Sequence, residues 1–136
     1  MARILPLLLS LALLCCAASQ STLRVPGEMM IRDEIYFGLS GRDGAIIGEQ
    51  EWSRFLDTAI TPRFPDGLTV IDAAGQYRLG NGLLQKERSR VVVLVHPASA
   101  ENDSSVARIC RSYVVSFNQE SVMRVSSACG QAFIGR

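Results

Sequence analysis

Apolar residues are spaced along the chain in two ways, which separate strands from helices. Residues 34–39 alternate between polar and apolar, which is typical of a strand. From Glu49 the apolar residues recur at helical spacing until Pro62 ends the helix. This apolar stripe consists of Trp52, Phe55, Leu56, Ala59 and Ile60. The pattern predicts a first strand followed by a first helix.

Two longer strands, over residues 68–79 and 83–96, meet at Gly80-Asn81-Gly82. Asn-Gly between two apolar stretches is the strongest short hairpin signal in a sequence. With Asn-Gly as the two loop residues, Gln76 faces Glu87 across the hairpin. A bulge near Gly75 would shift that register.

A second helix is expected after Pro97, with Asn102 or Asp103 as its N-cap. Its apolar face consists of Val106, Ile109, Cys110, Tyr113, Val114 and Phe117. Residues 121–128 then alternate as a last strand. The order β, α, β, β, α, β is that of the ferredoxin-like fold, in the α+β class. We therefore expect a four-stranded antiparallel sheet, with both helices on one face and the first and third strands in its centre.

The other face of this sheet is expected to be open to a partner. The register places Leu68, Val70, Val91, Val93 and Val95 under the helices. It places Thr69, Ile71, Arg90, Val92, Leu94 and His96 on the open face, together with Tyr36 and Arg124 if their strands alternate. A half-apolar sheet surface is usually covered by a second subunit or a ligand.

Two interpretations of the open face follow, beside the ordinary one of solvated strand positions. In the first, two copies of the chain form a face-to-face homodimer. In the second, the face carries a pocket for a small anionic ligand, held by Tyr36, Arg90, His96 and Arg124. Arginine suits that role because its guanidinium presents a fork of donors to carboxylates and similar anions.

The beginning of the chain has the layout of a signal peptide over residues 1–18, with a basic start and an apolar run too short to span a bilayer. Two kinds of processing fit it. Ordinary cleavage would follow Ala18, whereas lipoprotein-type cleavage would leave a lipid on Cys16. A flexible leader over residues 19–32 and one domain over residues 33–136 complete the chain. We expect an exported protein, periplasmic or secreted, whose contact with a membrane is limited to a lipid anchor.

Charge and cysteine content bear on the expected partners and on a possible disulfide. Of 14 basic residues Arg3 leaves with the signal, so 13 remain against 13 acidic ones, and a neutral domain gives no reason to expect nucleic acid as a partner. Export favours disulfides, and Cys110 and Cys129 can pair in only one way, which would stabilise the fold by about 3 kcal/mol.

Catalytic signatures are few. The single histidine, His96, precedes a proline at the end of a strand, and no nucleophile elbow, phosphate-binding loop or zinc-spaced set is present. We therefore expect no metal and no cofactor.

Several segments carry a resemblance to a known family. They are TPRFPDGLTV over residues 61–70, GQYR over 75–78, ERS over 87–89, HP over 96–97 and QESVMRV over 119–125. On these segments the chain resembles a family of exported bacterial proteins catalogued as domain of unknown function thirty-five seventy-four. The resemblance implies export, often with a lipoprotein signal, and no particular activity. Its matched polar residues form a second candidate cluster, which consists of Arg63, Asp66, Gln76, Glu87, Ser89, Gln119 and Ser121.

Each member of this cluster also has a purely structural interpretation. Asp66 lies in a turn by its chemistry, and Gln76 opposite Glu87 makes an ordinary cross-strand pair. Arg63 can bind the carbonyls at the end of the first helix, where cations are favourable.

Three functions remain. The favoured one is a small binding or interaction module of the cell envelope. The alternatives are a cofactor-free enzyme, with a pocket on the open sheet face for a small anionic substrate, and a purely structural component. Convergence of Tyr36, Arg90, His96 and Arg124 on one concavity would favour the enzyme.

Overall fold

The computed structural model describes residues 27–78 and 80–135. The predicted signal peptide, Cys16 and the first part of the predicted leader lie outside these residues. The elements are, in order, β1 (Glu28–Gly38), α1 (Glu49–Phe55), the π-helical turn η1 (Leu56–Ile60), β2 (Thr69–Arg78), β3 (Leu84–His96), α2 (Ala100–Ser116) and β4 (Met123–Gln131).

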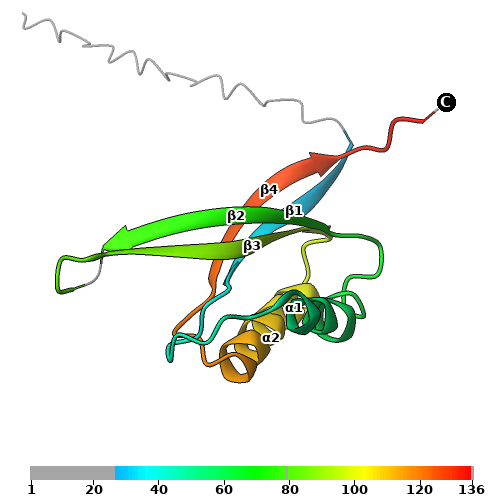
Figure 1. Ribbon diagram of the computed structural model, residues 1–136. Helices are drawn as coiled ribbons and strands as arrows, with labels where there is room; N and C mark the ends of the chain where they lie inside the picture. The colour runs from blue at the N-terminus through cyan, green and yellow to red at the C-terminus, as the bar shows by residue number, and fades with distance from the viewer. Residues whose placement is uncertain (1–26, 79, 136) are drawn as a thin grey trace, which may run out of the picture.

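The four strands form one antiparallel sheet in the order β2-β3-β1-β4. Figure 1 shows α1 and α2 together on one side of it, so the opposite face carries no helix. This arrangement confirms the predicted α+β, ferredoxin-like fold, with the first and third strands in the centre.

The start of β1, the N-cap of α2 and the bounds of β4 differ from those predicted, since β4 covers Met123–Gln131 instead of residues 121–128. β1 begins at Glu28, inside the predicted leader, because β4 pairs with it from Glu28 opposite Gln131 onward. The leader sequence lacked apolar alternation there, but pairing with a neighbouring strand satisfies its backbone groups. The N-cap of α2 is Ser99 rather than Asn102 or Asp103, since the Ser99 hydroxyl accepts the backbone N–H of Asn102 at 3.1 Å.

The core lies between the sheet and the two helices. Phe37 of β1 contacts the rings of Trp52 and Phe55 from α1 and of Tyr113 from α2, with centroids 4.7 Å apart for Phe37 and Tyr113. Such edge-to-face contacts between buried rings add to the hydrophobic stabilisation of the layer. The predicted apolar faces of both helices are confirmed, because Trp52, Phe55 and Tyr113 are all buried.

The register of the β2–β3 hairpin differs from the predicted one by a single residue. Gln76 lies opposite Lys86, whereas Glu87 lies opposite Gly75. The last pair is Arg78 with Leu84, so five residues separate the strands and the Asn-Gly pair is only part of the loop.

This shift reverses the predicted faces of β3. Side chains on a strand alternate, so a slip of one residue moves every side chain to the other face. Val92 and Leu94 are fully buried under the helices, where Val91 and Val93 had been expected. Val91, Val93 and Val95 belong instead to the open face, because they alternate with Val92 and Leu94.

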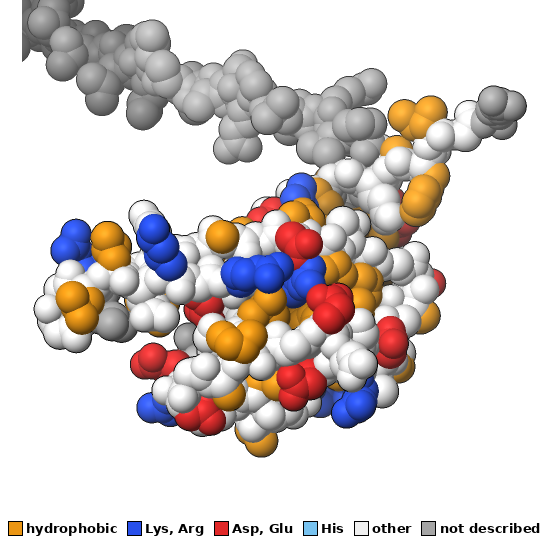
Figure 2. Space-filling view, in the orientation of Figure 1, with side chains coloured by type: hydrophobic (Ala, Val, Ile, Leu, Met, Phe, Trp, Pro, Cys, Tyr) orange, Lys and Arg blue, Asp and Glu red, His pale blue; other side chains and the backbone are white. Residues whose placement is uncertain are grey.

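The hairpin also reaches past the rest of the sheet. β1 pairs with β3 only from Ser89 to His96, and the carbonyl of Arg88 accepts one further backbone N–H, from Leu39 at 2.9 Å. Residues 84–87 pair with β2 alone. We call residues 74–88 the hairpin arm. Figure 1 shows the arm extending well beyond the helices, and Figure 2 shows it standing clear of the body of the molecule.

Candidate functional site

The four residues predicted to form a pocket on the open face do not meet there. Tyr36 lies on that face, opposite Val91 and Met123. Arg90, His96 and Arg124 lie on the opposite face, with the helices, because the register of β3 and β4 turns them that way. The predicted open-face pocket is therefore wrong.

Arg90 is already bound by the protein's own carboxylates. Its guanidinium forms ion pairs with Glu49 of α1 and Asp72 of β2, and only 13% of its side chain is exposed. Its buried Nε has no hydrogen-bond partner among the described residues. Because both terminal nitrogens are occupied, Arg90 is not free to hold an anion.

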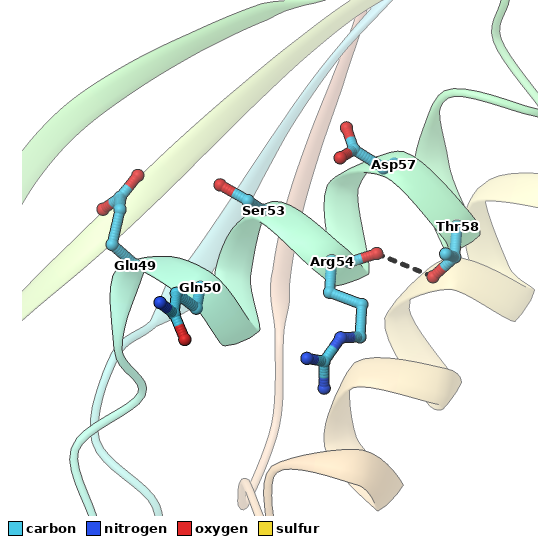
Figure 3. Close-up of a pocket in the computed structure, with 6 residues that line it drawn as sticks. All are labelled: Glu49, Gln50, Ser53, Arg54, Asp57 and Thr58. Carbon is cyan, nitrogen blue, oxygen red and sulfur yellow. Dashed lines mark hydrogen bonds between the residues drawn. The ribbon is translucent and has the colours of Figure 1, made fainter.

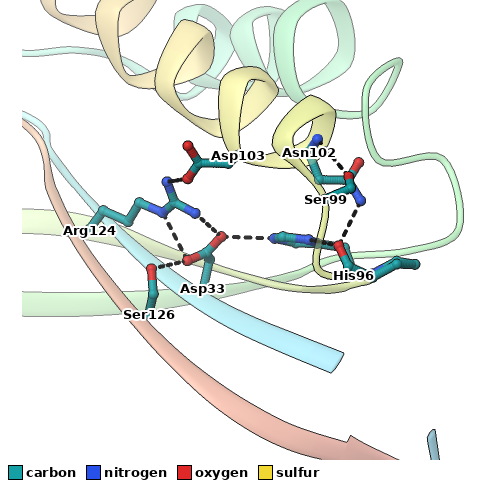
Figure 4. Close-up of polar contacts among 8 residues, drawn as sticks. Asp33, His96, Ser99, Asn102, Asp103, Arg124 and Ser126 are labelled. Atoms are coloured by element: carbon teal, nitrogen blue, oxygen red, sulfur yellow. Dashed lines mark hydrogen bonds and ion pairs between the residues drawn. The ribbon is translucent and has the colours of Figure 1, made fainter. Parts of the chain in front are cut away.

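His96 and Arg124 meet at a residue that the sequence did not single out. Asp33 of β1 is fully buried, and its carboxylate accepts hydrogen bonds from Nε and Nη2 of Arg124 at 2.9 and 2.8 Å. It also accepts from the hydroxyl of Ser126 on β4, and it lies 2.8 Å from Nε2 of His96 on β3 (Figure 4). Arg124 continues the network to Asp103 of α2, at 2.7 Å. We call these five residues the Asp33 cluster.

The His96 ring is held on both sides. Its Nδ1 lies 3.0 Å from the carbonyl oxygen of Pro97, which also accepts a hydrogen bond from the side chain of Asn102 (Figure 4). The imidazolium form would donate to both the Pro97 carbonyl and the Asp33 carboxylate. Phe64 packs against the ring, with centroids 5.3 Å apart.

The electrostatics of the cluster favour a charged Asp33. Burial by itself raises the pKa of this carboxyl, but the hydrogen bonds from Arg124, Ser126 and His96 outweigh burial, and the pKa lies below its ordinary value. The bonds to Asp33 and Asp103 raise the pKa of Arg124, with burial acting in the opposite direction. The cluster joins three strands to α2 and leaves no carboxylate oxygen of Asp33 free, so we assign it a structural role.

A sequence signal for Asp33 did exist. It precedes Ile35 by two residues, and therefore shares the buried face of β1 with Ile35 and Phe37. An aspartate at a core-facing strand position requires a buried partner.

A hollow of about 870 Å³ lies at the end of the molecule where the hairpin arm faces two loops. We call it the loop-end pocket. One loop joins β1 to α1, and the other joins α2 to β4. The pocket is lined by Ser40, Gly41, Arg42, Gly44, Ile46, Tyr77, Gln85, Lys86, Glu87, Gln119, Glu120 and Ser121. Three of these, Glu87, Gln119 and Ser121, belong to the polar cluster expected from the family resemblance.

Glu87 and Gln119 are the rigid polar groups of this pocket. Oε1 of Glu87 accepts the backbone N–H of Ser40 at 3.1 Å, and Nε2 of Gln119 donates to the carbonyl of Ser40 at 2.9 Å. Gln119 is 8% exposed, so its amide is fixed by packing as well. The Glu87 carboxylate lies directly over Gly38, where any Cβ would clash with it.

Glu87 keeps its negative charge uncompensated by a direct partner. Among residues 27–78 and 80–135, no lysine or arginine forms an ion pair with it, and no hydrogen bond is made to its Oε2. The Tyr113 hydroxyl donates instead to the carbonyl of Gly38, at 2.7 Å. Burial, and next the charge of Glu87, raise the pKa of Tyr113.

The remaining members of the predicted polar cluster lie elsewhere. Arg63 donates to the carbonyl of Ala59 at 2.6 Å, which confirms its expected place at the end of the first helix. Asp66 is exposed in the turn before β2. Gln76 is exposed opposite Lys86, and Ser89 lies opposite Gly38 in the sheet.

A second hollow, of about 440 Å³, follows the outer surface of α1 and η1 (Figure 3). Its lining consists of Glu49, Gln50, Ser53, Arg54, Asp57 and Thr58. All six come from one continuous helical segment, and the hydroxyl of Thr58 donates to the backbone carbonyl of Arg54 at 2.7 Å. No second element encloses this furrow, so we do not treat it as a site.

The predicted disulfide is not formed. Cys110 and Cys129 are both free thiols. Cys110 belongs to α2, whereas Cys129 pairs with Met30 and alternates with Ala128 onto the face away from the helices. The sheet therefore separates the two sulfurs. Burial raises the pKa of Cys110, which makes its thiolate less available.

Residues 27–78 and 80–135 contain no group of three or more His, Cys, Asp or Glu side chains arranged to bind a metal ion. The same residues include no helix of the length and hydropathy required to span a bilayer.

Comparison with known proteins identifies a family for this chain and two solved structures of similar fold. The family model described as "Protein of unknown function (DUF3574)" matches residues 32–133. No curated protein matches the sequence. A solved phage SAM lyase in complex with S-methyl-5'-thioadenosine is 22% identical, with a TM-score of 0.59 over 80% of this chain and 88% of that chain. A phage SAM lyase in the apo state is 19% identical, with a TM-score of 0.55 over 79% and 87%. At these identities the likeness shows a shared fold.

Proposed function

Because the chain belongs to the protein family of unknown function DUF3574, we propose that the polar residues on which its sequence resembles that family include a ligand site. On this proposal the protein is an exported binding module of the cell envelope. It holds a small organic molecule in the loop-end pocket. The matched residues that line the pocket are Glu87, Gln119 and Ser121.

One observation carries the proposal, which is the state of Glu87. Its carboxylate is positioned by Ser40 and by the absence of a side chain at Gly38, yet it has no cationic partner among the described residues. A rigid acceptor of this kind is usually satisfied by water or by a ligand. Hydrogen bonds to a charged acceptor are about twice as strong as neutral ones, so a ligand that supplies donors gains most here.

Beside Glu87 the pocket therefore favours a ligand with hydroxyl or amino donors, while Arg42 and Lys86 balance the acidic Glu87 and Glu120 in the rest of its lining. This differs from the small anion that Arg90, His96 and Arg124 were expected to bind, since the two arginines are occupied by the protein's own carboxylates. A protein of the same fold, the phage SAM lyase, binds S-methyl-5'-thioadenosine. Nucleosides carry donors of this kind and are the first ligand class to test.

The test uses S-methyl-5'-thioadenosine and adenosine as probes in isothermal titration calorimetry. The Glu87→Gln variant keeps an oxygen for the Ser40 N–H but loses the charge, so we expect its affinity to fall about 10- to 100-fold. Glu101→Gln, an exposed change on α2, is the matched control and keeps wild-type affinity. Equal binding by wild type and Glu87→Gln, or no binding of either probe by the wild type, would reject the proposed site and ligand class.

A second candidate function is a cofactor-free enzyme that uses the same pocket. The observation in its favour is that the unpaired Glu87 carboxylate is suited to accept a proton from a bound molecule. Mass spectrometry of the probe after incubation separates the two functions. A bound probe recovered unchanged supports binding alone, whereas conversion that disappears in Glu87→Gln supports catalysis.

Export is tested on the same protein by cell fractionation and intact mass. A periplasmic or secreted product that begins after Ala18 supports ordinary cleavage. A membrane-associated product with a lipid mass on Cys16 supports the anchored form. Full-length protein retained in the cytoplasm would contradict export.

A further inference from the structure

The face of the sheet away from the helices is mostly apolar and has no cover within the described chain. In the central stretch, where β1 pairs with β3, strand alternation places on it Thr69, Ile71, Ala73, Ser89, Val91, Val93, Val95, Arg32, Glu34, Tyr36, Met123, Val125 and Ser127. We call this set the open face. Ile71, Met123 and Val125 remain 47%, 55% and 47% exposed. Val91 is buried by its neighbours on the open face, and it does not belong to the core cluster under the helices.

The charges on the open face neutralise one another. Arg32 and Glu34 are the only charged members of the set, and they form an ion pair at 2.8 Å. The Tyr36 hydroxyl donates to the other oxygen of Glu34, at 2.9 Å. This central surface therefore carries no net charge, and its charged groups have partners before any contact is made. By the same alternation Glu28 and Glu87 continue this face at its two ends, outside the central set.

A neutral apolar surface of this kind is complementary to a copy of itself. Two copies related by a two-fold axis bring the same patch into contact, so a patch with net charge would repel its copy. The open face avoids that repulsion. It also offers no basic cluster that would attract an anionic membrane or a nucleic acid.

The size of the face matches what a dimer needs. β1 and β3 pair from Ile31 to Gly38, and four strands lie side by side. At about 3.3 Å per residue and about 4.8 Å between strands, the face measures about 26 by 19 Å. Two such faces cover about 1,000 Å² of flat area, and the relief of the side chains brings the buried surface toward the roughly 1,200–2,000 Å² of specific interfaces.

We infer that two copies of this chain associate through their open faces, sheet against sheet. The inference does not depend on the ligand proposed for the loop-end pocket. It assigns an occupant to a surface that would otherwise expose Ile71, Met123 and Val125 to water.

Sedimentation velocity of the full-length chain over a wide range of concentrations tests this inference. We expect a reversible dimer in the wild type. Ile71→Arg combined with Val125→Arg places charge on the face of each copy, and should raise the dissociation constant by at least about 100-fold. Val115→Arg is the matched control, because Val115 is 82% exposed on α2, away from the open face, and this variant should dimerise like the wild type.

Circular dichroism checks that the double variant is folded. We expect it to be, because both positions are half exposed in the single chain. Should the double variant fail to fold, Val125→Arg alone replaces it. A wild type that is monomeric at every concentration would overturn the inference. So would association that survives the charged variants, or that Val115→Arg abolishes equally.

Discussion

The Asp33→Asn substitution is the sharpest test of how the buried cluster stabilises the fold. The wild-type carboxylate accepts two hydrogen bonds from Arg124 and one from Ser126, and it lies 2.8 Å from Nε2 of His96. Asparagine keeps one acceptor oxygen, but its amide NH₂ then points at a donor. The charge that balances Arg124 from within the core is lost as well.

The expected cost follows from the burial of the site. Removing one partner of a buried ion pair typically costs about 3–5 kcal/mol, because it leaves the other charge uncompensated. Arg124 is 24% exposed and keeps its bond to Asp103, so we expect a loss near the lower end, about 3 kcal/mol. For a domain of this size each kcal/mol corresponds to about 4–8 °C in Tm, which predicts a fall of about 12–24 °C.

Urea unfolding followed by circular dichroism at neutral pH measures this difference. Asp57→Asn is the matched control, since it makes the same chemical change at an exposed position of η1 and should alter stability by less than about 0.5 kcal/mol. A loss of under about 1 kcal/mol in Asp33→Asn would refute the assignment of the cluster as a stabilising network.

The remaining predictions concern pH and the loop-end pocket. The folded pKa of Asp33 lies below its ordinary value of 3.8, so the stability that its charge contributes is present above that value and is lost as the pH falls through the folded pKa. The difference in unfolding free energy between wild type and Asp33→Asn should therefore close in urea titrations taken to low pH. A difference that stays constant would contradict this. The pKa of Tyr113 lies above its ordinary value of 10.0, so the stability that the neutral phenol contributes is present below pH 10 and is lost as the pH rises through the folded pKa. An absorbance titration should show this phenol ionising above pH 10. Tyr113→Phe, which loses the hydrogen bond to Gly38, should lower the free energy of unfolding by about 1 kcal/mol. Gly38→Ala drives a Cβ into the Glu87 carboxylate, which lies at the end of a flexible side chain and can move aside, so stability should change little. The displaced carboxylate loses the Ser40 N–H, so probe binding in calorimetry should weaken, whereas Gly75→Ala, which meets no atom within 4 Å, should leave binding intact.

The hairpin shows why local chemistry did not determine the register. Asn-Gly predicted a turn, and the turn is present, but its geometry belongs to a five-residue loop. The Asn81 side chain accepts the backbone N–H of Leu83 at 3.0 Å, and Gly82 has a φ of +85°. Both a two-residue and a five-residue loop satisfy the same local signal, yet they differ by one residue in register and so place opposite faces of β3 against the helices.

The candidate sites also depend on strand register, which the sequence did not determine. Of the seven polar residues taken from the family resemblance, three line one pocket, although Glu87 is distant in the sequence from Gln119 and Ser121. Their role as a site stays a prediction. The residues chosen from the register, Arg90, His96 and Arg124, were assigned to the wrong face. Their real partners, among them Asp33, depended on the pairing of three strands.

The sequence by itself determined the element order, the ferredoxin-like topology and the apolar faces of both helices. These features follow from local periodicity, and periodicity is written in neighbouring residues. Only the tertiary structure decided the hairpin register, the separation of Cys110 from Cys129 and the burial of Asp33. Each of these depends on contacts between strands that are distant in the chain, where a shift of one residue changes the partner of every side chain.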